Sequence, residues 1–317
     1  MITNKRIFMT GGGGFIGSWL CYKLADSNEI IVYDNSRRDA LSKRSFKGNK
    51  NIRFISGDIL DKRFLKKSVP SVDIVIHLAA IAGVTSYYKI PKETMEVNIV
   101  GTYNLLEVIK DRNIERYIYF STSEVYGSYS FRSREDGDTS QGNISDPRWT
   151  YSISKLAAEK LGYCYYMEHQ LPMASIRPFN IYGPWQVGEG AIQSFLTKAI
   201  NNIDIPITGD GSQIRAWCYI EDLLDAVILC LEKEKAAGNT FNIGNPEGAI
   251  TILGLAKKII EMTNSKSKLF FREHIGTDIE LRVPDIAKAR KILGYSPKTG
   301  IEEGLTFTID AYKQNPW

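Results

Sequence analysis

The sequence predicts an α/β fold in which a doubly wound parallel sheet is followed by a smaller C-terminal domain. In the first half of the chain, short β-branched runs alternate with longer helical patterns, as in chains that alternate strands and helices. Some runs are apolar at nearly every position, for example VDIVIHLAA at residues 72–80. Such strands are buried on both faces, which is typical of a parallel sheet covered by helices.

The expected elements follow this alternation in chain order. Strands are expected at residues 6–10, 30–34, 52–56, 73–78 and 116–121. Helices are expected at residues 15–26, 92–111 and 151–169. Pro91 stands in the first-turn position of the second helix. Residues 129–146, rich in Ser, Gly, Asp and Asn, are expected to form a long loop over the site.

The pattern changes beyond about Arg177, where Pro and Gly punctuate the chain and helical patterns follow at residues 221–233 and 252–262. FNIG at residues 241–244 is expected to be one more strand, which returns to the main sheet. We therefore expect interleaved domains. Residues 1–178 together with 217–245 would form the larger domain, and residues 179–317 would otherwise form the smaller one.

Composition and charge exclude several classes of protein. With 317 residues, of which 43% are hydrophobic and 24% charged, the chain can build one large domain or two unequal ones with a real core. The 40 Lys and Arg against 36 Asp and Glu leave a net charge of only +4, without a block of like charge. This balance argues against binding to nucleic acid or to an anionic membrane, whereas acidic small molecules still fit.

Metal sites, disulfides and membrane segments are not expected. The four cysteines and three histidines are scattered, without a paired C-x-x-C spacing. The apolar stretch before the first glycines is too short for a signal-peptide core. The longest apolar run, residues 226–231, falls well short of the ~20 residues that a membrane span needs. We therefore expect a cytoplasmic protein.

A glycine run directly follows the first expected strand. Gly11, Gly14 and Gly17 of TGGGGFIG have the G-x-x-G-x-x-G spacing, and a helical pattern begins at once. A tight turn at this place brings backbone N–H groups against a pyrophosphate, and side chains at the glycine positions would block that approach. The pattern therefore predicts the dinucleotide site of a Rossmann-like doubly wound sheet. A merely flexible turn is the alternative, because short glycine patterns recur by accident.

The second expected strand ends in Asp34, about 20 residues beyond the first glycine. A carboxylate there accepts the hydroxyl groups of an adenosine ribose and repels a 2′-phosphate, which favours NAD. Arg37 and Arg38 stand close enough in sequence to keep NADP as the alternative. The loops GDI and LAA after the next strands belong to the same sheet edge, unless they are ordinary turns. The expected cofactor contacts are Gly11, Gly14, Phe15, Ile16, Gly17, Asp34, Asn35, Asp58, Ile59, Leu78, Ala79, Ala80, Tyr151 and Lys155.

A candidate catalytic pair stands in WTYSISK. Tyr151 and Lys155 are four residues apart on an expected helix, so both project from one face. A phenol with a pKa near ~10 is a poor base at neutral pH, but an adjacent ammonium stabilises the phenolate. We therefore expect Lys155 to lower the pKa of Tyr151 and to hold a nicotinamide ribose. The alternative is a surface Tyr–Lys pair without a chemical role.

Polar residues also follow the fifth expected strand, in STSEVYG. A hydroxyl such as that of Thr122 can hydrogen-bond the substrate oxygen that Tyr151 deprotonates. Glu124 can exchange a proton with a carbon that a neighbouring ketone has made acidic. Glu124 could instead simply cap the next turn.

These residues carry a family resemblance. TGGGGFIG, the acidic end of the second strand, LAA, STSEVYG, YSISK, RPFNIYGP, GDGSQIR and RVPDI occur in the order typical of the extended short-chain dehydrogenase/reductases that act on nucleotide sugars. The chain resembles the epimerases, dehydratases and decarboxylases of that family over nearly its whole length. The resemblance implies that Thr122, Tyr151 and Lys155 are catalytic. It also implies a tightly held NAD and a homodimer that pairs through helices 92–111 and 151–169.

By the same resemblance, the larger domain binds NAD and the smaller domain binds a nucleotide-diphosphate sugar. Similar proteins hold the diphosphate with the residues that correspond to Asn180 and Arg215, while Arg282 contributes near the phosphates or the sugar. Guanidinium groups suit paired phosphate oxygens. Without the flanking motifs, either arginine could be a solvated surface residue.

The resemblance implies a shared first step that leaves a 4-keto sugar, after which three outcomes diverge. Thr122-Ser123-Glu124 resembles the triplet of UDP-glucuronate decarboxylases and of some 4,6-dehydratases. Ser123 stands where many dehydratases carry the Asp that serves as the acid for water loss. Decarboxylation needs no such acid, and an arginine such as Arg282 could hold a uronate carboxylate.

The sequence therefore favours a UDP-uronate decarboxylase or a 4,6-dehydratase, with a nucleotide-sugar 4-epimerase as the alternative. A hypothesis of another class is a dinucleotide sensor that has lost catalysis. The intact pair of Tyr151 and Lys155 argues against such a sensor.

Overall fold

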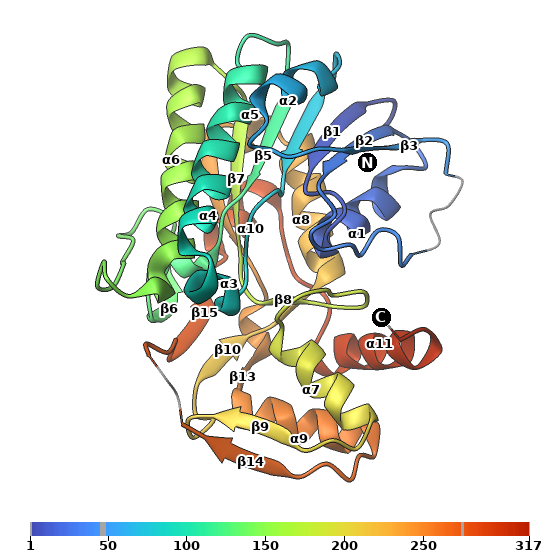
Figure 1. Ribbon diagram of the computed structural model, residues 1–317, viewed down its shortest axis with the longest axis vertical. Helices are drawn as coiled ribbons and strands as arrows, with labels where there is room; N and C mark the ends of the chain where they lie inside the picture. Colours follow the sequence, from blue (N-terminus) through green and yellow to red (C-terminus); the bar gives the residue numbers. More distant parts are fainter. Residues whose placement is uncertain (1, 45–48, 274–275, 317) are drawn as a thin grey trace.

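The computed structural model describes residues 2–44, 49–273 and 276–316, and it confirms the α/β class (Figure 1). The central sheet of this described chain has seven strands in the order β12-β7-β5-β4-β1-β2-β3. Every pairing in that sheet is parallel. The strands are β1 (Arg6–Thr10), β2 (Glu29–Asp34), β3 (Ile52–Ser56), β4 (Ile74–His77), β5 (Arg116–Phe120), β7 (Met173–Pro178) and β12 (Asn239–Ile243). The strand expected at 241–244 is thus confirmed as β12, at the edge of the main sheet.

Helices cover both faces of this sheet (Figure 1). One face is covered by α1 (Phe15–Leu24), α8 (Ile220–Glu232) and α10 (Ala287–Leu293). The other face is covered by α2 (Lys62–Ser68), α5 (Gly101–Ile109) and α6 (Thr150–His169). Successive residues of one strand point to opposite faces, so Ile7 and Met9 belong to one core and Phe8 to the other. This explains why the inner strands are apolar at most positions.

The helix expected at 92–111 is interrupted. After α3 (Val84–Lys89), the chain forms α4 (Pro91–Met95), a π-helical turn η1 (Glu96–Val100) and then α5. A π-turn inserts a residue into the helical repeat and is frequent at functional sites. Here it carries the buried side chain of Asn98.

A second sheet has the order β13-β10-β15-β6. Its strands are β6 (Tyr129–Ser133), β10 (Ile214–Ala216), β13 (Ala249–Thr251) and β15 (Leu281–Pro284). The expectation of an unbroken loop over 129–146 is therefore wrong, because its first residues form β6. They pair with β15, which lies far along the chain, so no local pattern could reveal the strand.

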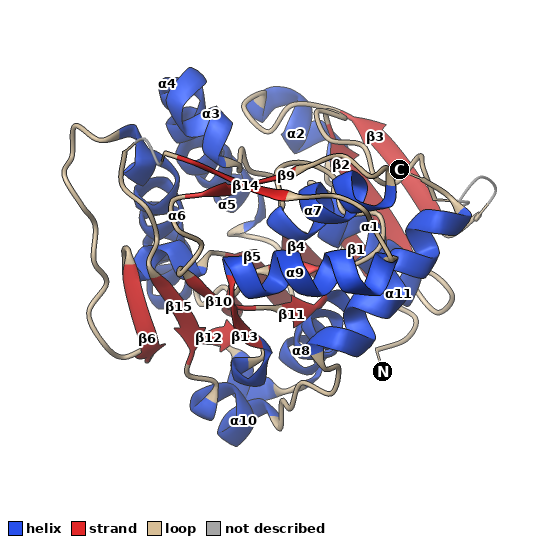
Figure 2. Ribbon diagram, turned by 90° about the horizontal axis from the view of Figure 1, so that it is seen from below, coloured by secondary structure: helices blue, strands red, loops and turns tan. Residues whose placement is uncertain are grey.

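The remaining elements are short pairs and helices that occupy largely the lower part of Figure 1 and are seen from below in Figure 2. Two parallel pairs are β8 (Ile181–Tyr182) with β11 (Cys218–Tyr219), and β9 (Ile205–Thr208) with β14 (Leu269–Arg272). The helices are α7 (Ala191–Ile200), α9 (Ile252–Thr263) and α11 (Ile301–Gln314). Short turns are η2 (Ser123–Tyr126), η3 (Pro147–Trp149), η4 (Glu234–Ala236) and η5 (Pro246–Gly248). Of the helices in the described ranges, none has the length and apolarity to cross a bilayer.

Candidate functional site

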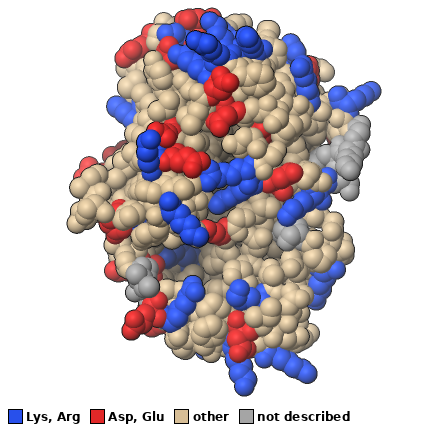
Figure 3. Space-filling model, in the orientation of Figure 1, with Lys and Arg blue, Asp and Glu red and all other residues tan. Residues whose placement is uncertain are grey.

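A cavity of about 430 Å³ opens at the carboxyl ends of the central strands. This is where parallel sheets of this topology bind ligands, because the strand order reverses between β1 and β4. Every residue expected to contact the cofactor lines this cavity, together with Ser121 and Asn180. Lys and Arg atoms cross the middle of the face drawn in Figure 3, between the upper and lower parts of the molecule.

The glycine loop between β1 and α1 lies tightly against the sheet. Gly11 has φ +71°, and a Cβ there would overlap the backbone of Leu78 and Ala79. A Cβ at Gly17 would overlap Gly12. Gly14, by contrast, has an ordinary backbone conformation, and its Cβ would meet only the carbonyl oxygen of Gly11 at 3.4 Å. Two of the glycines are therefore required by the chain itself, whereas Gly14 is free to serve the ligand.

Asp34 ends β2 and holds this loop in place. Its carboxylate accepts hydrogen bonds from the backbone N–H of Gly13 at 2.9 Å and of Ser36 at 2.7 Å. Burial raises the pKa of Asp34, while these two hydrogen bonds lower it. The carboxylate thus stands at the cavity wall where a ribose would lie.

The two arginines that kept NADP as an alternative are both engaged elsewhere. Arg37 forms an ion pair with Glu93 at 2.7 Å. Arg38 donates to the carbonyl oxygen of Ala82. Each arginine therefore already has an acceptor within the chain and is not reserved for a 2′-phosphate beside Asp34.

The cavity fits a dinucleotide. The glycines leave open a space that side chains would fill. The buried hydroxyl of Ser121, in the cavity wall, has no hydrogen-bond partner among the described residues. The cofactor is NAD. Gly11, Gly14 and Gly17 would receive its pyrophosphate, and Asp34 its adenosine ribose.

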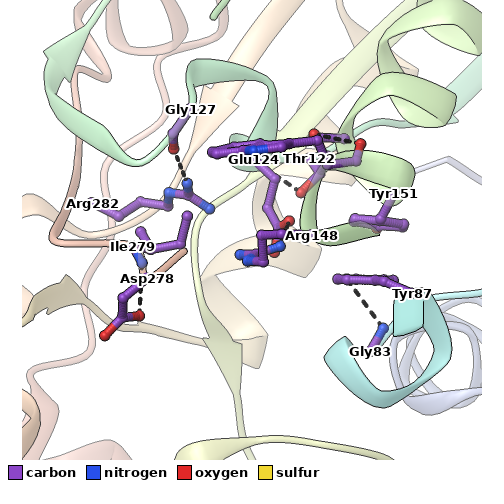
Figure 4. A network of polar contacts seen from close by, with 12 residues as sticks. Gly83, Tyr87, Thr122, Glu124, Gly127, Arg148, Tyr151, Asp278, Ile279 and Arg282 are labelled. Atoms are coloured by element: carbon purple, nitrogen blue, oxygen red, sulfur yellow. Dashed lines mark hydrogen bonds and ion pairs between the residues drawn. The ribbon is translucent and has the colours of Figure 1, made fainter. Parts of the chain in front are cut away.

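Tyr151 and Lys155 lie one turn apart on α6, as expected, and both line the cavity, with Lys155 buried and Tyr151 half-buried. The ring of Tyr151 stacks on Tyr87 with centroids 5.3 Å apart and an interplanar angle of 8° (Figure 4). A hydrogen bond joins its phenol to Thr122. Tyr87 was not expected in the site from the sequence.

The expectation that Lys155 lowers the pKa of Tyr151 is wrong for the chain itself. Burial, and then the charge of Glu124, raise the pKa of Tyr151 well above its ordinary value. Burial also lowers the pKa of Lys155 to about 7, against the attraction of Glu159. The Lys155 ammonium lies 4.4 Å from the ring centre of Tyr119, so a cation–π contact holds it. A neutral phenol is therefore the resting form.

Thr122 and Glu124 lie at the start of η2. The Thr122 hydroxyl accepts a hydrogen bond from the backbone N–H of Glu124 at 3.2 Å and so caps this turn. The Glu124 carboxylate forms a salt bridge with Arg148, with Nη1 and Oε2 2.7 Å apart (Figure 4). The alternative that Glu124 merely caps the turn is therefore wrong, because its side chain pairs with the buried guanidinium of Arg148.

The residues expected to bind a diphosphate sugar lie on separate elements. Asn180 lines the cavity and donates to the carbonyl oxygen of Ala216 at 3.0 Å. Arg215 and Arg282 stand side by side in register on β10 and β15. Nη2 of Arg215 lies 3.8 Å from Oδ1 of Asp278. Arg282 donates a hydrogen bond to the carbonyl oxygen of Gly127.

A buried polar network that the sequence did not predict supports the helix of Tyr151. Asn98 accepts from Ile81 N–H at 2.8 Å and donates to the Ile81 carbonyl oxygen at 3.1 Å and to the Ser154 hydroxyl at 2.9 Å. Ser154 in turn donates to the Tyr151 carbonyl oxygen at 2.7 Å. The only local signal is a polar residue on the apolar face of the helical pattern around EVNIV.

His77 connects the ends of β1 and β4 to the same network. Its Nδ1 lies 2.6 Å from the Thr10 hydroxyl, and its Nε2 lies 2.9 Å from the Thr102 hydroxyl, which donates to the Asn98 carbonyl oxygen. Because the Thr102 hydroxyl donates its proton to Asn98, it can only accept from His77, so Nε2 carries the ring proton. Nδ1 then accepts a hydrogen bond from the Thr10 hydroxyl. Burial, and then the charge of Lys155, lower the pKa of His77 to about 3, which keeps the ring neutral.

Across the part of the chain that the structure describes, no group of three or more His, Cys, Asp and Glu side chains could hold a metal ion. His274 lies outside the described residues.

Comparison with known proteins agrees with this geometry. The profile of the "NAD dependent epimerase/dehydratase family" matches residues 7–244. UDP-N-acetyl-alpha-D-glucosaminuronate decarboxylase of Bacillus cytotoxicus is 34% identical over 320 residues, which cover 98% of each chain. UDP-glucuronic acid decarboxylase 5 of Arabidopsis thaliana is 33% identical, covering 98% of this chain and 90% of the relative.

A solved structure is similar over the same length. UDP-glucuronic acid 4-epimerase from Bacillus cereus, in complex with UDP-glucuronic acid and NAD, superposes with a TM-score of 0.89 at 31% identity. The similarity covers 98% of this chain and 99% of the epimerase. The Rossmann-like fold expected from the sequence is thereby confirmed.

Proposed function

The chain belongs to the NAD dependent epimerase/dehydratase family and is an NAD-dependent enzyme, and from this premise we propose that it decarboxylates a UDP-uronate through a transient 4-keto sugar. The observation that carries the proposal is the excess of positive charge around Glu124 beside Tyr151, where Arg148 and Arg282 are buried. An acidic sugar fits such a place, because guanidinium groups bind carboxylates with paired hydrogen bonds.

The 4,6-dehydratase variant of the proposal is less well supported. Ser123 stands where an acid for the loss of water would be needed, and its side chain is a buried hydroxyl. A decarboxylase has no need of that acid. The relatives with decarboxylase names point the same way.

Bound NAD supplies the acceptor and later the donor of a hydride at the sugar C4, together with a positive ring close to the phenol. Tyr151 takes the proton of the C4 hydroxyl and later returns it. Thr122 orients the Tyr151 phenol through its hydrogen bond. Lys155, on the next turn of α6, would hold the nicotinamide ribose. Because the resting phenol is neutral, its proton must leave before it can act as a base.

The 4-keto sugar formed from a uronate is a β-keto acid. The C5–C6 bond breaks, its electron pair passes into the enolate of the C4 ketone, and carbon dioxide leaves. C5 then takes up one proton, and we assign its delivery to Glu124, which neighbours both Thr122 and Tyr151. Return of the hydride and of the Tyr151 proton gives a UDP-pentose, with one proton consumed overall.

The experiment that tests the proposal is incubation of the purified protein with UDP-glucuronate. We expect release of carbon dioxide and a UDP-pentose by mass spectrometry and NMR. Formation of UDP-galacturonate without carbon dioxide would instead identify a 4-epimerase, and a 4-keto-6-deoxy product from dTDP-glucose a 4,6-dehydratase. Silence with a panel of UDP-, GDP-, CDP- and dTDP-sugars, despite bound NAD, would support the non-catalytic sensor.

The 4-epimerase is the second candidate. It is favoured by the similarity to the UDP-glucuronic acid 4-epimerase that was solved in complex with UDP-glucuronic acid and NAD. The same arginines would serve that reaction. The two reactions differ in the fate of C6 and in the face of C4 to which the hydride returns.

The assignment of the site residues is part of the proposal. Those around the glycine loop would bind NAD, and Thr122, Asn180, Arg215 and Arg282 would bind the sugar nucleotide. Residues 1–178 with 217–245 would form the NAD-binding domain, and the rest of 179–317 the substrate domain. The position of β12 beside β7 supports this interleaving.

We also propose a homodimer in the cytoplasm. Apolar side chains are exposed on η1, α5 and α6, namely Val100, Tyr103, Tyr163 and Met167. A second copy would cover them, and size-exclusion chromatography with light scattering would show a dimer that charged substitutions at Tyr103 and Met167 split. The cysteines of the described chain are free thiols, as in proteins of a reducing compartment.

A further inference from the structure

Arg148 is a largely buried arginine whose guanidinium has one protein acceptor among the described residues. The residue is 6% exposed and is the middle residue of η3, two positions before α6 begins. Within the described ranges, its side chain makes one hydrogen bond, from Nη1 to Glu124 Oε2 at 2.7 Å. A guanidinium carries five N–H donors, so most of those of Arg148 have no hydrogen bond to the described protein. The remaining donors of Arg148 therefore favour a further acceptor.

Aromatic rings hold this guanidinium next to the catalytic phenol. Its central carbon lies 5.7 Å from the ring centre of Tyr87 and 5.9 Å from that of Trp149. Tyr87 is itself stacked on Tyr151 at 5.3 Å. Figure 4 shows Arg148 between Glu124 and these stacked rings. The ring of Tyr87 thus connects Arg148 to Tyr151, the residue proposed to act on the sugar C4 hydroxyl.

The other two arginines near Glu124 are occupied differently. Arg215 has Asp278 within 3.8 Å and donates to the carbonyl oxygens of Ile214 and Ile279. Arg282 donates from Nη2 to the Gly127 carbonyl oxygen, on the side of Glu124 away from Tyr151 in Figure 4, and its buried Nε has no partner among the described residues. Of these three cations, Arg148 is the one whose aromatic contacts lead to Tyr151.

We propose that Arg148 recognises the C6 carboxylate of a uronic acid sugar and so separates uronate from neutral hexose substrates. The inference rests on the proposed function and names the residue that selects its substrate class. In a hexuronate, C4 and C6 are both bonded to C5. When the C4 hydroxyl lies at Tyr151, the carboxylate must therefore lie close by. Arg148 keeps one N–H on Glu124 and offers its other N–H groups to the substrate.

Glu124 and the substrate carboxylate thus share one cation. Removing the charge of Glu124 frees Arg148 for the substrate and also removes a like-charge repulsion. The proposal therefore predicts opposite effects for the two members of the pair: R148M weakens uronate binding, and E124Q strengthens it. A purely structural salt bridge predicts damage from both substitutions.

The test measures dissociation constants of UDP-glucuronate, UDP-glucose and UDP-xylose by calorimetry on the NAD-loaded protein. These ligands carry at C5 a carboxylate, a CH₂OH group and a hydrogen. We expect R148M to weaken UDP-glucuronate about 10- to 100-fold, the effect of losing charge-assisted hydrogen bonds. UDP-glucose and UDP-xylose should change by no more than about 2-fold, because they present no charge to Arg148.

R282M is the matched control, because it removes another buried arginine from the same cluster. Its loss should weaken the three ligands alike if it serves the diphosphate. R148K keeps the charge but loses the planar fork, so it should weaken UDP-glucuronate less than R148M does. It also serves as the second variant if R148M does not fold, which NAD content and thermal melting will show.

The inference is overturned if R148M and R148K weaken the three ligands equally, or leave the preference for UDP-glucuronate unchanged. It is also overturned if the unmodified protein binds UDP-glucuronate no better than UDP-glucose. If the protein releases carbon dioxide while the Arg148 variants keep the preference, only the role of Arg148 fails. If no UDP-sugar binds, the proposed function fails as well.

Discussion

The cavity at the glycine loop and the polar cluster around Glu124, the dinucleotide end and the sugar end of the site, are built differently. At the dinucleotide end, backbone contacts set the shape, and the charged groups have partners within the chain: Asp34 accepts from Gly13 and Ser36, and Arg37 pairs with Glu93. The sugar end is the polar cluster around Glu124 beside Tyr151, where two buried arginines surround a single carboxylate and Nε of Arg282 has no partner among the described residues. The charged groups of the first end are thus paired within the chain, whereas the second end keeps a buried guanidinium N–H without a partner among the described residues.

This difference shows where selectivity resides. A preformed backbone cradle accepts any ligand of matching shape, since most of the free energy needed to order the site is spent when the chain folds. Buried donors without acceptors instead penalise every ligand that lacks the matching anion. We therefore expect changes at the dinucleotide end to affect retention of NAD, and changes at the sugar end to affect which sugar reacts.

The largest expected effect separates chemistry from cofactor retention. Y151F removes the proton acceptor, so turnover should fall about 10²- to 10⁴-fold, measured as product formed per enzyme. NAD content should remain unchanged, because the glycine loop is intact. Y163F, on an exposed side chain of the same helix, is the control and should keep full turnover. Full activity of Y151F would remove Tyr151 from the mechanism.

The glycine loop should divide into two kinds of position. G14A should weaken NAD by about 100-fold, or ~3 kcal/mol, at an unchanged melting temperature, because only ligand space is lost. G11A should lower both NAD affinity and stability, since its Cβ meets the backbone of Leu78 and Ala79 at φ +71°. Fluorescence titration and thermal melting check both, with G300A as a tolerated control. Equal melting temperatures of G11A and G14A would contradict this division.

His77 should make the dinucleotide end sensitive to acid. Its pKa of about 3 in the fold lies below the ordinary value, so the unfolded chain binds the extra proton as pH falls below about 6.5. The free energy of unfolding that neutral His77 contributes above that pH is lost progressively toward pH 3, by up to ~1.4 kcal/mol per pH unit. At pH 5 this loss amounts to about 2 kcal/mol. Urea unfolding at pH 7 and 5 measures this.

H77Q should be less stable at pH 7 but should lose less stability between pH 7 and 5. H169Q replaces an exposed histidine and should keep the slope of the unmodified protein. Identical slopes for H77Q and the unmodified protein would show that His77 is not the group responsible.

The smallest expected effect concerns the choice of dinucleotide. D34N keeps an acceptor for one backbone N–H but loses the charge, so NAD should bind about 10-fold more weakly, or ~1.4 kcal/mol. NADP should lose less or gain, since the carboxylate no longer repels a 2′-phosphate. Titration with both cofactors gives the ratio, and an unchanged ratio would remove Asp34 from the selection. D39N, on a neighbouring loop carboxylate, is the control.

The sequence predicted the dinucleotide end better than the sugar end. Gly11, Gly17 and Asp34 belong to one strand–turn–helix–strand unit, and their roles depend on short spacings that a linear pattern carries. Tyr151 and Lys155 were predicted for the same reason, since four residues bring two side chains to one helix face.

What the linear pattern missed depends on distant partners. Arg148 and Tyr87 are polar or aromatic residues in unremarkable segments, and only packing places them against Glu124 and Tyr151. The strand β6 was expected as loop because its partner β15 lies far along the chain. The pKa of Tyr151 was predicted in the wrong direction because burial and the charge of Glu124 raise it.

The sequence by itself therefore determined the sheet class, the glycine cradle, the acidic end of β2 and the Tyr–Lys pair on one helix. Each of these arises from interactions between residues close in the chain. Only the tertiary structure decided the charge balance around Glu124, the resting state of Tyr151 and the support of its helix through Asn98. Those properties depend on burial and on electrostatic forces, which act through space between residues that the chain order keeps far apart.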